Sequence, residues 1–174
     1  MVDRARLAAG LGLACVVSLT VSCGYALSGL GTLPEHIKAL VILPFENRTQ
    51  RPEIEQRITE EIASQFSRRG KYEIVTDRSQ AQAILEGAVT IYRTTPVQFN
   101  SSGRATRIEA MIEIQATLRD LTNDAVIWSQ GGLLFRDQFD VPESGEFFDQ
   151  ETLALDDIAA GAAGAVVTSI LEGF

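Results

Sequence analysis

The sequence predicts an α+β fold, a two-layer sandwich in which two α-helices pack on one face of a mixed β-sheet. Apolar residues recur at helical spacing in two segments, residues 52–69 and 150–171. Between them, residues 107–119 alternate polar and apolar side chains, which is typical of a long strand with one buried and one wet face. The expected order is strand, helix, four strands, helix (β-α-β-β-β-β-α), and this order favours two packed layers.

The first three elements form a predicted parallel crossover. The apolar run 40–43 ends at a proline and is expected to be a buried strand. A helix is expected at residues 52–69, because Pro52 suits the first turn of a helix and Gly70 suits the residue that ends one. Apolar residues spaced by four form one stripe along it. Residues 72–76 form the next strand, and a strand–helix–strand unit of this length favours a right-handed parallel connection.

Three more strands and a second helix complete the predicted domain. The strands are expected at residues 85–92, 107–119 and 126–135. Gly131 and Gly132 predict a bulge or kink in the last of them. Gly161 and Gly164 weaken the final helix, residues 150–171, by about 1 kcal/mol each relative to alanine. Such glycines are tolerated where a helix lies very close to a sheet.

The N-terminus has the anatomy of a bacterial secretory signal that ends at Cys23. A cationic start is followed by an apolar stretch and then by small residues. The stretch is shorter than the roughly 20 residues that a spanning helix needs, so a cleaved signal peptide is predicted. The segment from Leu19 to Cys23 resembles a lipobox, although Thr20 stands where that pattern prefers leucine; the alternative is an ordinary signal with an incidental cysteine. Cys23 is therefore the predicted lipidation site, carrying acyl chains such as palmitate.

The predicted organisation is a signal peptide (1–22), a lipidated N-terminal leader (23–38) and a single domain (39–174). Cleavage removes two arginines and one aspartate, which changes the net charge from −8 to −9. A domain this acidic is a poor nucleic-acid ligand. Because anionic lipid also repels it, a lipid anchor or a protein partner must hold it at a membrane. Cys15 leaves with the signal peptide, and the acylation of Cys23 then leaves no thiol for a disulfide.

The sequence does not predict an enzyme. His36, the one histidine, stands before the first strand and is expected to be an ordinary surface residue, with no nucleophile arrangement around it. Carboxylates gather between residues 143 and 157, but their spacing fits no calcium-loop motif, so we interpret them as solvated acids at a helix start. Neither a cofactor nor a metal is predicted.

Two predicted loops carry exposed apolar residues that are candidates for partner contact. Residues 94–103 contain Val97 and Phe99, and residues 140–148 contain Phe147 and Phe148. The alternative is that these side chains fold back over the sheet edges. Three arginines flank the first loop: Arg93, Arg104 and Arg107. They could bind phosphate groups of a partner. The alternative is that they pair with Glu86 or Glu109 across the strands.

Several stretches resemble one family. Residues 23–29, Cys-Gly-Tyr-Ala-Leu-Ser-Gly, are similar to the mature start of LptE-type lipoproteins, Cys-Gly-(Tyr/Phe)-x-Leu-x-Gly. The order of elements is also similar, and the stretches 43–49, 85–87 and 118–121 with Trp128 resemble divergent members. The resemblance implies an outer-membrane lipoprotein that plugs and helps assemble the LptD β-barrel, with which it inserts lipopolysaccharide into the outer leaflet.

The same resemblance implies further details of location and partners. It implies a lipid-anchored protein that faces the periplasm or lies inside a barrel, with lipopolysaccharide bound through basic residues. Gly24 is not the aspartate that favours inner-membrane retention. The alternative is a CsgG-like outer-membrane secretion lipoprotein, whose domain has a similar strand end, but this short chain leaves little room for its membrane-spanning hairpins.

Overall fold

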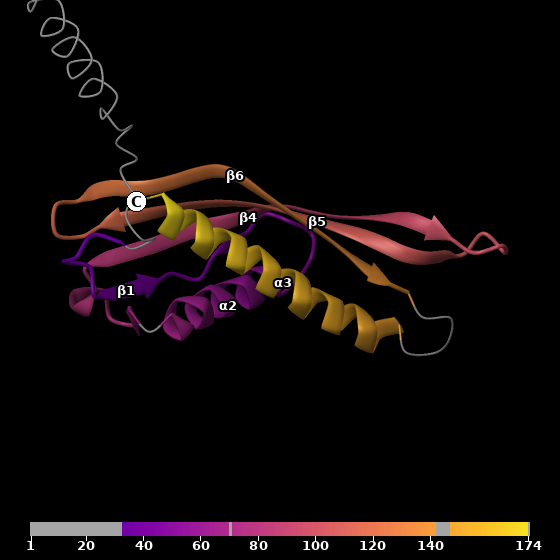
Figure 1. Cartoon of the computed structure of the whole chain (residues 1–174), viewed down its shortest axis with the longest axis horizontal. Helices are drawn as coiled ribbons and strands as arrows, with labels where there is room; N and C mark the ends of the chain where they lie inside the picture. The colour runs from indigo at the N-terminus through magenta and orange to yellow at the C-terminus, as the bar shows by residue number, and fades with distance from the viewer. Residues whose placement is uncertain (1–32, 70, 142–146, 174) are drawn as a thin grey trace, which may run out of the picture.

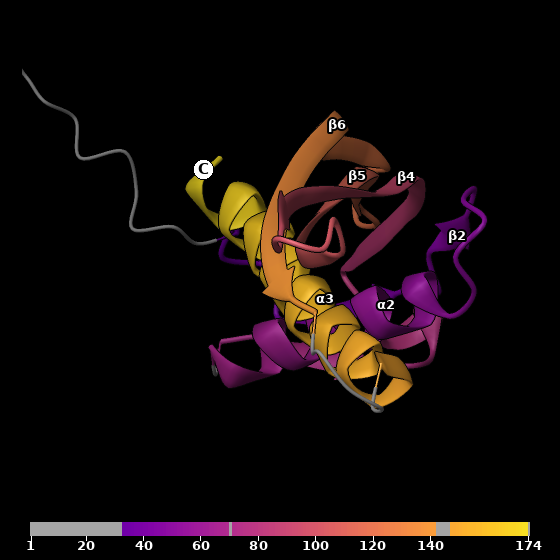
Figure 2. The same ribbon diagram turned by 90° about the vertical axis from the view of Figure 1, so that its right-hand side faces the viewer.

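The computed structural model describes residues 33–69, 71–141 and 147–173. The predicted signal peptide and Cys23 lie outside this range. The elements are β1 (Ala39–Ile42), β2 (Glu46–Asn47), α2 (Ile54–Arg68), β3 (Glu73–Val75), a 3₁₀ turn (Arg78–Gln80), β4 (Ala83–Phe99), β5 (Ala105–Asp120), β6 (Ala125–Asp140) and α3 (Phe147–Glu172). Both helices lie on one side of the sheet, so the predicted two-layer α+β sandwich is confirmed (Figures 1 and 2).

The sheet is mixed and follows the order β3-β1-β4-β5-β6. Strand β1 lies between β3 and β4 and runs parallel to both, so the predicted crossover through α2 is confirmed. Strands β4, β5 and β6 form an antiparallel meander. The short strand β2, which pairs with β4, was expected to be a loop, because two polar residues show no alternation.

Strand β5 has the predicted dry and wet faces. Its core-facing residues from position 110 on are buried; they are Ala110, Ile112, Ile114, Ala116 and Leu118. The intervening residues are only partly buried. We call the sheet face away from the helices the open face. The alternation therefore decides which β5 side chains join the core and which face away from it.

Both helices bury apolar stripes against this sheet. The stripe of α2 consists of Ile54, Ile58, Ile62 and Phe66, each 0% exposed. In α3, Gly161 lies so close to the sheet that a Cβ there would stand 2.3 Å from the Phe135 ring, which confirms the predicted reason for that glycine. At Gly164 the nearest atom would be Gln65 Nε2 at 3.8 Å, so sterics do not demand that glycine.

The glycine pair in β6 forms the predicted bulge. Ile114 pairs with Leu133 and Ala116 with Gln130, so two residues of β6 lie opposite one residue of β5. The bulge shifts which positions of β6 face the helices, from Trp128 before it to Leu133 and Phe135 after it.

The segment Ala154–Glu172 of α3 is, by length and composition, long and apolar enough to cross a membrane. However, 56% of that window is buried inside the protein. Its apolar residues are explained by packing against α2, β5 and β6.

The predicted bounds of both contact loops are wrong, because the neighbouring strands and helix extend into residues that were expected to be loop. Strand β4 continues through Pro96 to Phe99, so Val97 and Phe99 lie on a strand, and the turn is confined to residues 100–104. A proline can stand in this strand because its outer edge is unpaired there. Strand β6 likewise continues to Asp140, and Phe147 begins α3, so the second phenylalanine pair lies on a helix rather than a loop.

Candidate ligand- and partner-binding arm

The far ends of β4 and β5 extend beyond both helices as a β-arm (Figure 1). We define the arm as residues 90–113 together with residues 133–140 of β6, which pair with it; its base, at Ile112 and Phe135, still packs in the core beside α3, and its outer part is free of the helices. Seven consecutive residues of β4, 93–99, are exposed. The rest of β4 has neighbouring strands at both edges and the helices over one face, so the arm is the most exposed part of this strand.

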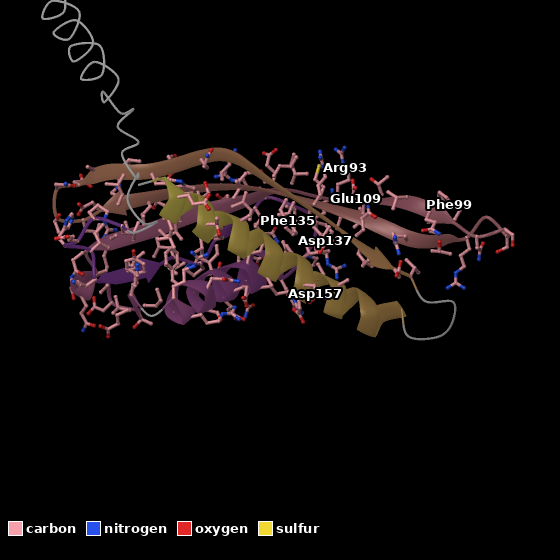
Figure 3. All side chains as sticks on the ribbon, in the orientation of Figure 1. Arg93, Phe99, Glu109, Phe135, Asp137 and Asp157 are labelled. Atoms are coloured by element: carbon pink, nitrogen blue, oxygen red, sulfur yellow. The ribbon has the colours of Figure 1, made fainter. Side chains whose placement is uncertain are left out.

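The arm carries a row of two arginines across its open face. Arg93 of β4 pairs with Met111 of β5, and Met111 pairs with Arg136 of β6. Directly paired residues on neighbouring strands project from the same face, and the adjacent Ile112 faces the core. Figure 3 shows Arg93 on the side of the sheet away from α3. Both arginines are exposed, so two guanidinium groups flank one thioether on the open face.

The nearest carboxylates on this face have other partners. Glu109 accepts a hydrogen bond from Gln138 Nε2 at 3.3 Å, and Glu113 accepts one from Thr90 Oγ1 at 2.9 Å. Within the described part of the chain, no ion pair joins Arg93 or Arg136 to a carboxylate. The row therefore offers positive charge to an external anion.

The structure separates the three arginines that the sequence grouped together. Arg107 Nε donates to Asp140 Oδ1 at 2.7 Å, which fastens β5 to the end of β6. This hydrogen bond and the charge of Arg107 lower the pKa of Asp140. The backbone N–H of Arg104 donates to Asn100 Oδ1 at 3.0 Å, within the turn. Arg107 thus pairs across strands as the structural alternative expected, although with a different acid, and only Arg93 belongs to the open row.

Apolar side chains accompany the row. Val97 is 45% exposed and Phe99 58% exposed, near the tip of the arm. Leu134, 44% exposed, pairs with Glu113 and so shares the open face with Arg136. The arm therefore combines cations with apolar surface, a pairing that suits an amphiphilic ligand or an interface near lipid.

Sequence reasoning missed Met111, Leu134 and Arg136. The bulge at Gly131 and Gly132 shifts the faces of β6, so the alternation of β6 taken alone does not place Arg136 beside Arg93. The double glycine was the available signal, because a bulge moves every later side chain to the opposite face.

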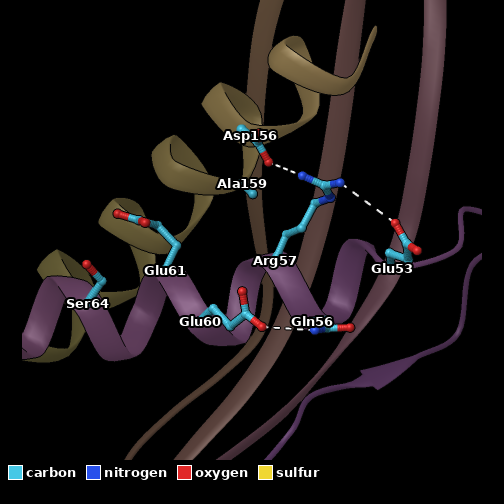
Figure 4. Close-up of a pocket in the computed structure, with 8 residues that line it drawn as sticks. All are labelled: Glu53, Gln56, Arg57, Glu60, Glu61, Ser64, Asp156 and Ala159. Carbon is cyan, nitrogen blue, oxygen red and sulfur yellow. Dashed lines mark hydrogen bonds and ion pairs between the residues drawn. The ribbon is translucent and has the colours of Figure 1, made fainter. Parts of the chain in front are cut away.

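A hollow with a volume of about 570 Å³ lies between α2 and α3, away from the arm (Figure 4). Its acidic lining is crossed by Arg57, which forms ion pairs with Asp156 of α3 and, at 3.7 Å, with Glu53. Asp156 is thus an ion-pair partner rather than a simply solvated acid. Among the described residues, no group of three potential ligands is placed to hold a metal ion. We interpret this hollow as the ion-paired seam between the helices.

His36 is exposed, as expected, but it has a buried partner. Its Nε2 lies 2.6 Å from Oδ2 of Asp120, whose side chain is 1% exposed. Burial alone raises the pKa of Asp120, but hydrogen bonds from the Thr122 hydroxyl and N–H and from His36 outweigh it, and the net effect lowers that pKa. This cluster joins the segment before β1 to the β5–β6 turn.

The Asp120 cluster should make stability depend on pH in the acid range. Because the folded-state pKa of Asp120 lies below its unfolded value of about 3.9, the carboxylate stabilises the fold above that value, and the contribution is lost as pH falls through the lowered folded pKa. Asp120→Ala should therefore lower the melting temperature at pH 7, and the gap from the wild type should narrow towards pH 2–3. A gap that is constant across this range would show that packing, not charge, holds the site.

The fold is a small α+β domain whose mixed sheet extends past its helices as a projecting arm and leaves one face open. The chain belongs to the LptE family of lipopolysaccharide-assembly proteins, which matches residues 37–170. That family is one of membrane-associated lipopolysaccharide-assembly lipoproteins and not one of enzymes. No curated protein matches the chain.

Solved structures share the fold. An uncharacterized lipoprotein B from Nitrosomonas europaea is 17% identical, with 86% of this chain and 91% of that one covered and a TM-score of 0.55. The rare lipoprotein B from Shewanella oneidensis is 10% identical over 76% and 93% of the two chains, with a TM-score of 0.52. The protein XCC0632 from Xanthomonas campestris is 14% identical over 79% and 85%, with a TM-score of 0.55.

Proposed function

We propose that this chain is an outer-membrane lipoprotein that plugs and helps assemble an LptD-like β-barrel, and that the two together insert lipopolysaccharide into the outer leaflet. Membership of the lipopolysaccharide-assembly family supports the class of cargo. The observation that carries the proposal is the arm, with its open Arg93–Met111–Arg136 row beside exposed apolar residues. The family match also favours this function over the CsgG-like secretion alternative.

The row suits the phosphate groups of lipopolysaccharide. Neighbouring strands are about 4.8 Å apart, so the Cα atoms of Arg93 and Arg136 stand about 10 Å apart across β5. Two long side chains from these positions can converge on one phosphate, or each can bind one of a pair. Guanidinium groups bind phosphate through charge-assisted, bidentate hydrogen bonds. Met111 and Leu134 lie next to them and suit the start of an acyl chain.

Neutralising the row should weaken lipopolysaccharide binding. Hydrogen bonds to charged groups contribute about 1.5–3 kcal/mol each, so Arg93→Gln with Arg136→Gln should raise the Kd for purified lipopolysaccharide at least tenfold. Each single variant, Arg93→Gln and Arg136→Gln, is compared with Arg119→Gln, which removes one arginine charge from the same sheet face but outside the row, where its partner is Asp124. Titrations at two salt concentrations, with intact and enzymatically dephosphorylated lipopolysaccharide, measure the effect. Equal affinities for both lipids would remove phosphate recognition from the row.

The tip of the arm should contribute to the barrel interface. Apolar anchors that are buried on binding cost about 1–3 kcal/mol when truncated, so Val97→Ser with Phe99→Ser should reduce co-purification of the barrel from detergent-solubilised outer membrane. The melting temperature should hardly change, because both side chains are exposed in the free protein. Val126→Ser, at an exposed position near the opposite end of β6, is the control. Undiminished co-purification of the double variant would place the barrel contact elsewhere.

A further inference from the structure

A hollow of about 400 Å³ lies at the point where the chain enters the domain from its N-terminal side. Its apolar lining includes Leu33, Ile37 and Tyr72, which are buried and belong to the core. Leu33 N donates a hydrogen bond to the Tyr72 hydroxyl at 2.8 Å, so the first described residue is fastened to the wall of the hollow. The leader that carries Cys23 therefore joins the domain at the rim of this hollow.

The rim carries both lysines of the chain, Lys38 and Lys71. Both are exposed. Within the described part of the chain, neither side-chain amine forms an ion pair or a hydrogen bond. Glu35 is the carboxylate in the lining, and it forms no ion pair with another described residue either. The hollow thus joins apolar walls to a rim with a surplus of positive charge.

Further charges lie close to the hollow, and their balance is also positive. Arg69, the C-cap residue of α2, donates to Thr168 Oγ1 at 3.2 Å and, among the described residues, has no carboxylate partner. Glu73 begins β3, and its N–H donates to the Lys38 carbonyl at 2.9 Å. Three cations therefore stand against two acids here, in a mature chain whose predicted net charge is −9.

The acids further along α2 do not cancel this local charge. Glu60 and Glu53 stand about 14 and 24 Å from Arg69 along the helix axis at 1.5 Å per residue. The Debye length is roughly 8 Å at physiological salt, so charges at those distances are largely screened. The net charge of the domain opposes adsorption from solution, whereas the charge of the hollow acts once an anchor has brought it to a surface.

We propose that this hollow docks on the membrane leaflet that holds the acyl chains of Cys23, with the phosphate of an anionic phospholipid between Lys38 and Lys71. Ammonium groups bind phosphate as point charges, and the apolar walls suit the glycerol end of the lipid. The position of the leader selects this partner, because residues 24–32 keep the headgroups at most about 35 Å from Leu33. A tether this short gives the surface a high effective concentration at the hollow.

This docking orients the arm. Strand β4 runs from Ala83, which pairs with Leu40 of β1, to Phe99 at the tip, about 50 Å further at 3.4 Å per residue. Figure 1 shows the start of β1 and the tip of the arm at opposite ends of the molecule. With the hollow on the leaflet, the arm of the free lipoprotein extends away from the membrane, and its tip stays uncovered for a partner. The docking goes beyond the proposed function and rests only on its predicted anchor.

Acetylation of the two lysines tests the docking on the wild-type, full-length lipoprotein. Lys38 and Lys71 carry the only side-chain amines of the chain, and phosphatidylcholine and phosphatidylglycerol carry none, so mass spectrometry measures each lysine directly. An anionic surface favours each nearby lysine about fivefold, so vesicles that contain phosphatidylglycerol should slow acetylation of both by about that factor relative to phosphatidylcholine alone. Inorganic phosphate added to phosphatidylcholine vesicles should give no protection, which separates a headgroup in a bilayer from free phosphate.

Two controls make this measurement decisive. Gln98→Lys adds an amine near the tip of the arm, at an exposed position, and its acetylation should be equal in both kinds of vesicle. Flotation with phosphatidylcholine vesicles reports the anchor separately. Protein that floats but whose two native lysines react equally in both vesicles would overturn the docking alone. Protein that does not float would contradict the anchor and the docking together.

The orientation has its own test. A fluorophore on Ser67→Cys, in the last turn of α2, or on Ser101→Cys, in the turn of the arm, is exposed to quenching by a nitroxide on lipid headgroups. In vesicles with phosphatidylglycerol the first label should be quenched and the second should not. Lys38→Gln with Lys71→Gln should reduce this difference to its level in phosphatidylcholine, whereas arginine at both positions should preserve it, with unchanged melting temperatures. Equal quenching of both labels, or a difference that ignores the lysines, would refute the docking.

Discussion

Replacing Ile112 with aspartate should destabilise the folded domain by about 3–5 kcal/mol, the largest effect on stability that we expect from one substitution. Ile112 is 0% exposed and pairs with Tyr92 on one side and Phe135 on the other. A carboxylate there would be buried without a charged partner and would also remove apolar contacts from the centre of the core. Urea unfolding followed by circular dichroism measures the loss, which is a large share of a typical domain's stability.

The matched control is a substitution on the opposite face of the same strand. Gln115→Lys, on the open face and only partly buried, should cost about 0.5 kcal/mol or less. Its amide oxygen has only a long contact of 3.5 Å with Arg48 Nη1 to lose. Equal destabilisation by both substitutions would mean that the two faces of β5 are not assigned correctly.

Replacing Cys23 with alanine should abolish membrane attachment. This expectation rests on the sequence before Cys23, in which a charged start is followed by an apolar stretch and then by small residues. Cys23 lies outside the described residues. Without the cysteine there is no acceptor for the acyl chains, and the net negative charge of the domain opposes adsorption to the bare anionic bilayer surface. Fractionation should find the variant either soluble after alternative cleavage or still joined to its signal peptide. The wild-type protein should remain in the outer-membrane fraction.

Mass spectrometry of the mature wild-type protein provides the complementary measurement. It should show an N-terminal cysteine at position 23 with acyl chains attached. Cys15→Ala is the control, because that cysteine lies within the signal peptide and its loss should leave the modification intact. A mature protein that begins at any other residue without lipid would contradict the lipobox interpretation.

The elements that sequence predicts well are those whose pattern is local. The four-residue spacing of Ile54, Ile58, Ile62 and Phe66 determines one buried face of α2, because 3.6 residues per turn bring those side chains together. The alternation of β5 determines its faces in the same way. Gly161 could be given a reason in advance, because a missing side chain in a helix otherwise costs stability.

What the sequence by itself determined is the layer architecture, the order of its elements and the resemblance to the family that the match over residues 37–170 confirms. Only the tertiary structure decided how far β4 runs past Pro96, that Arg107 pairs with Asp140, and that Arg93 and Arg136 share one face. Strand pairing uses backbone groups that nearly every residue carries, so neither its length nor its register is written in local composition. One bulge at Gly131 and Gly132 then decides which side of the sheet Arg136 occupies.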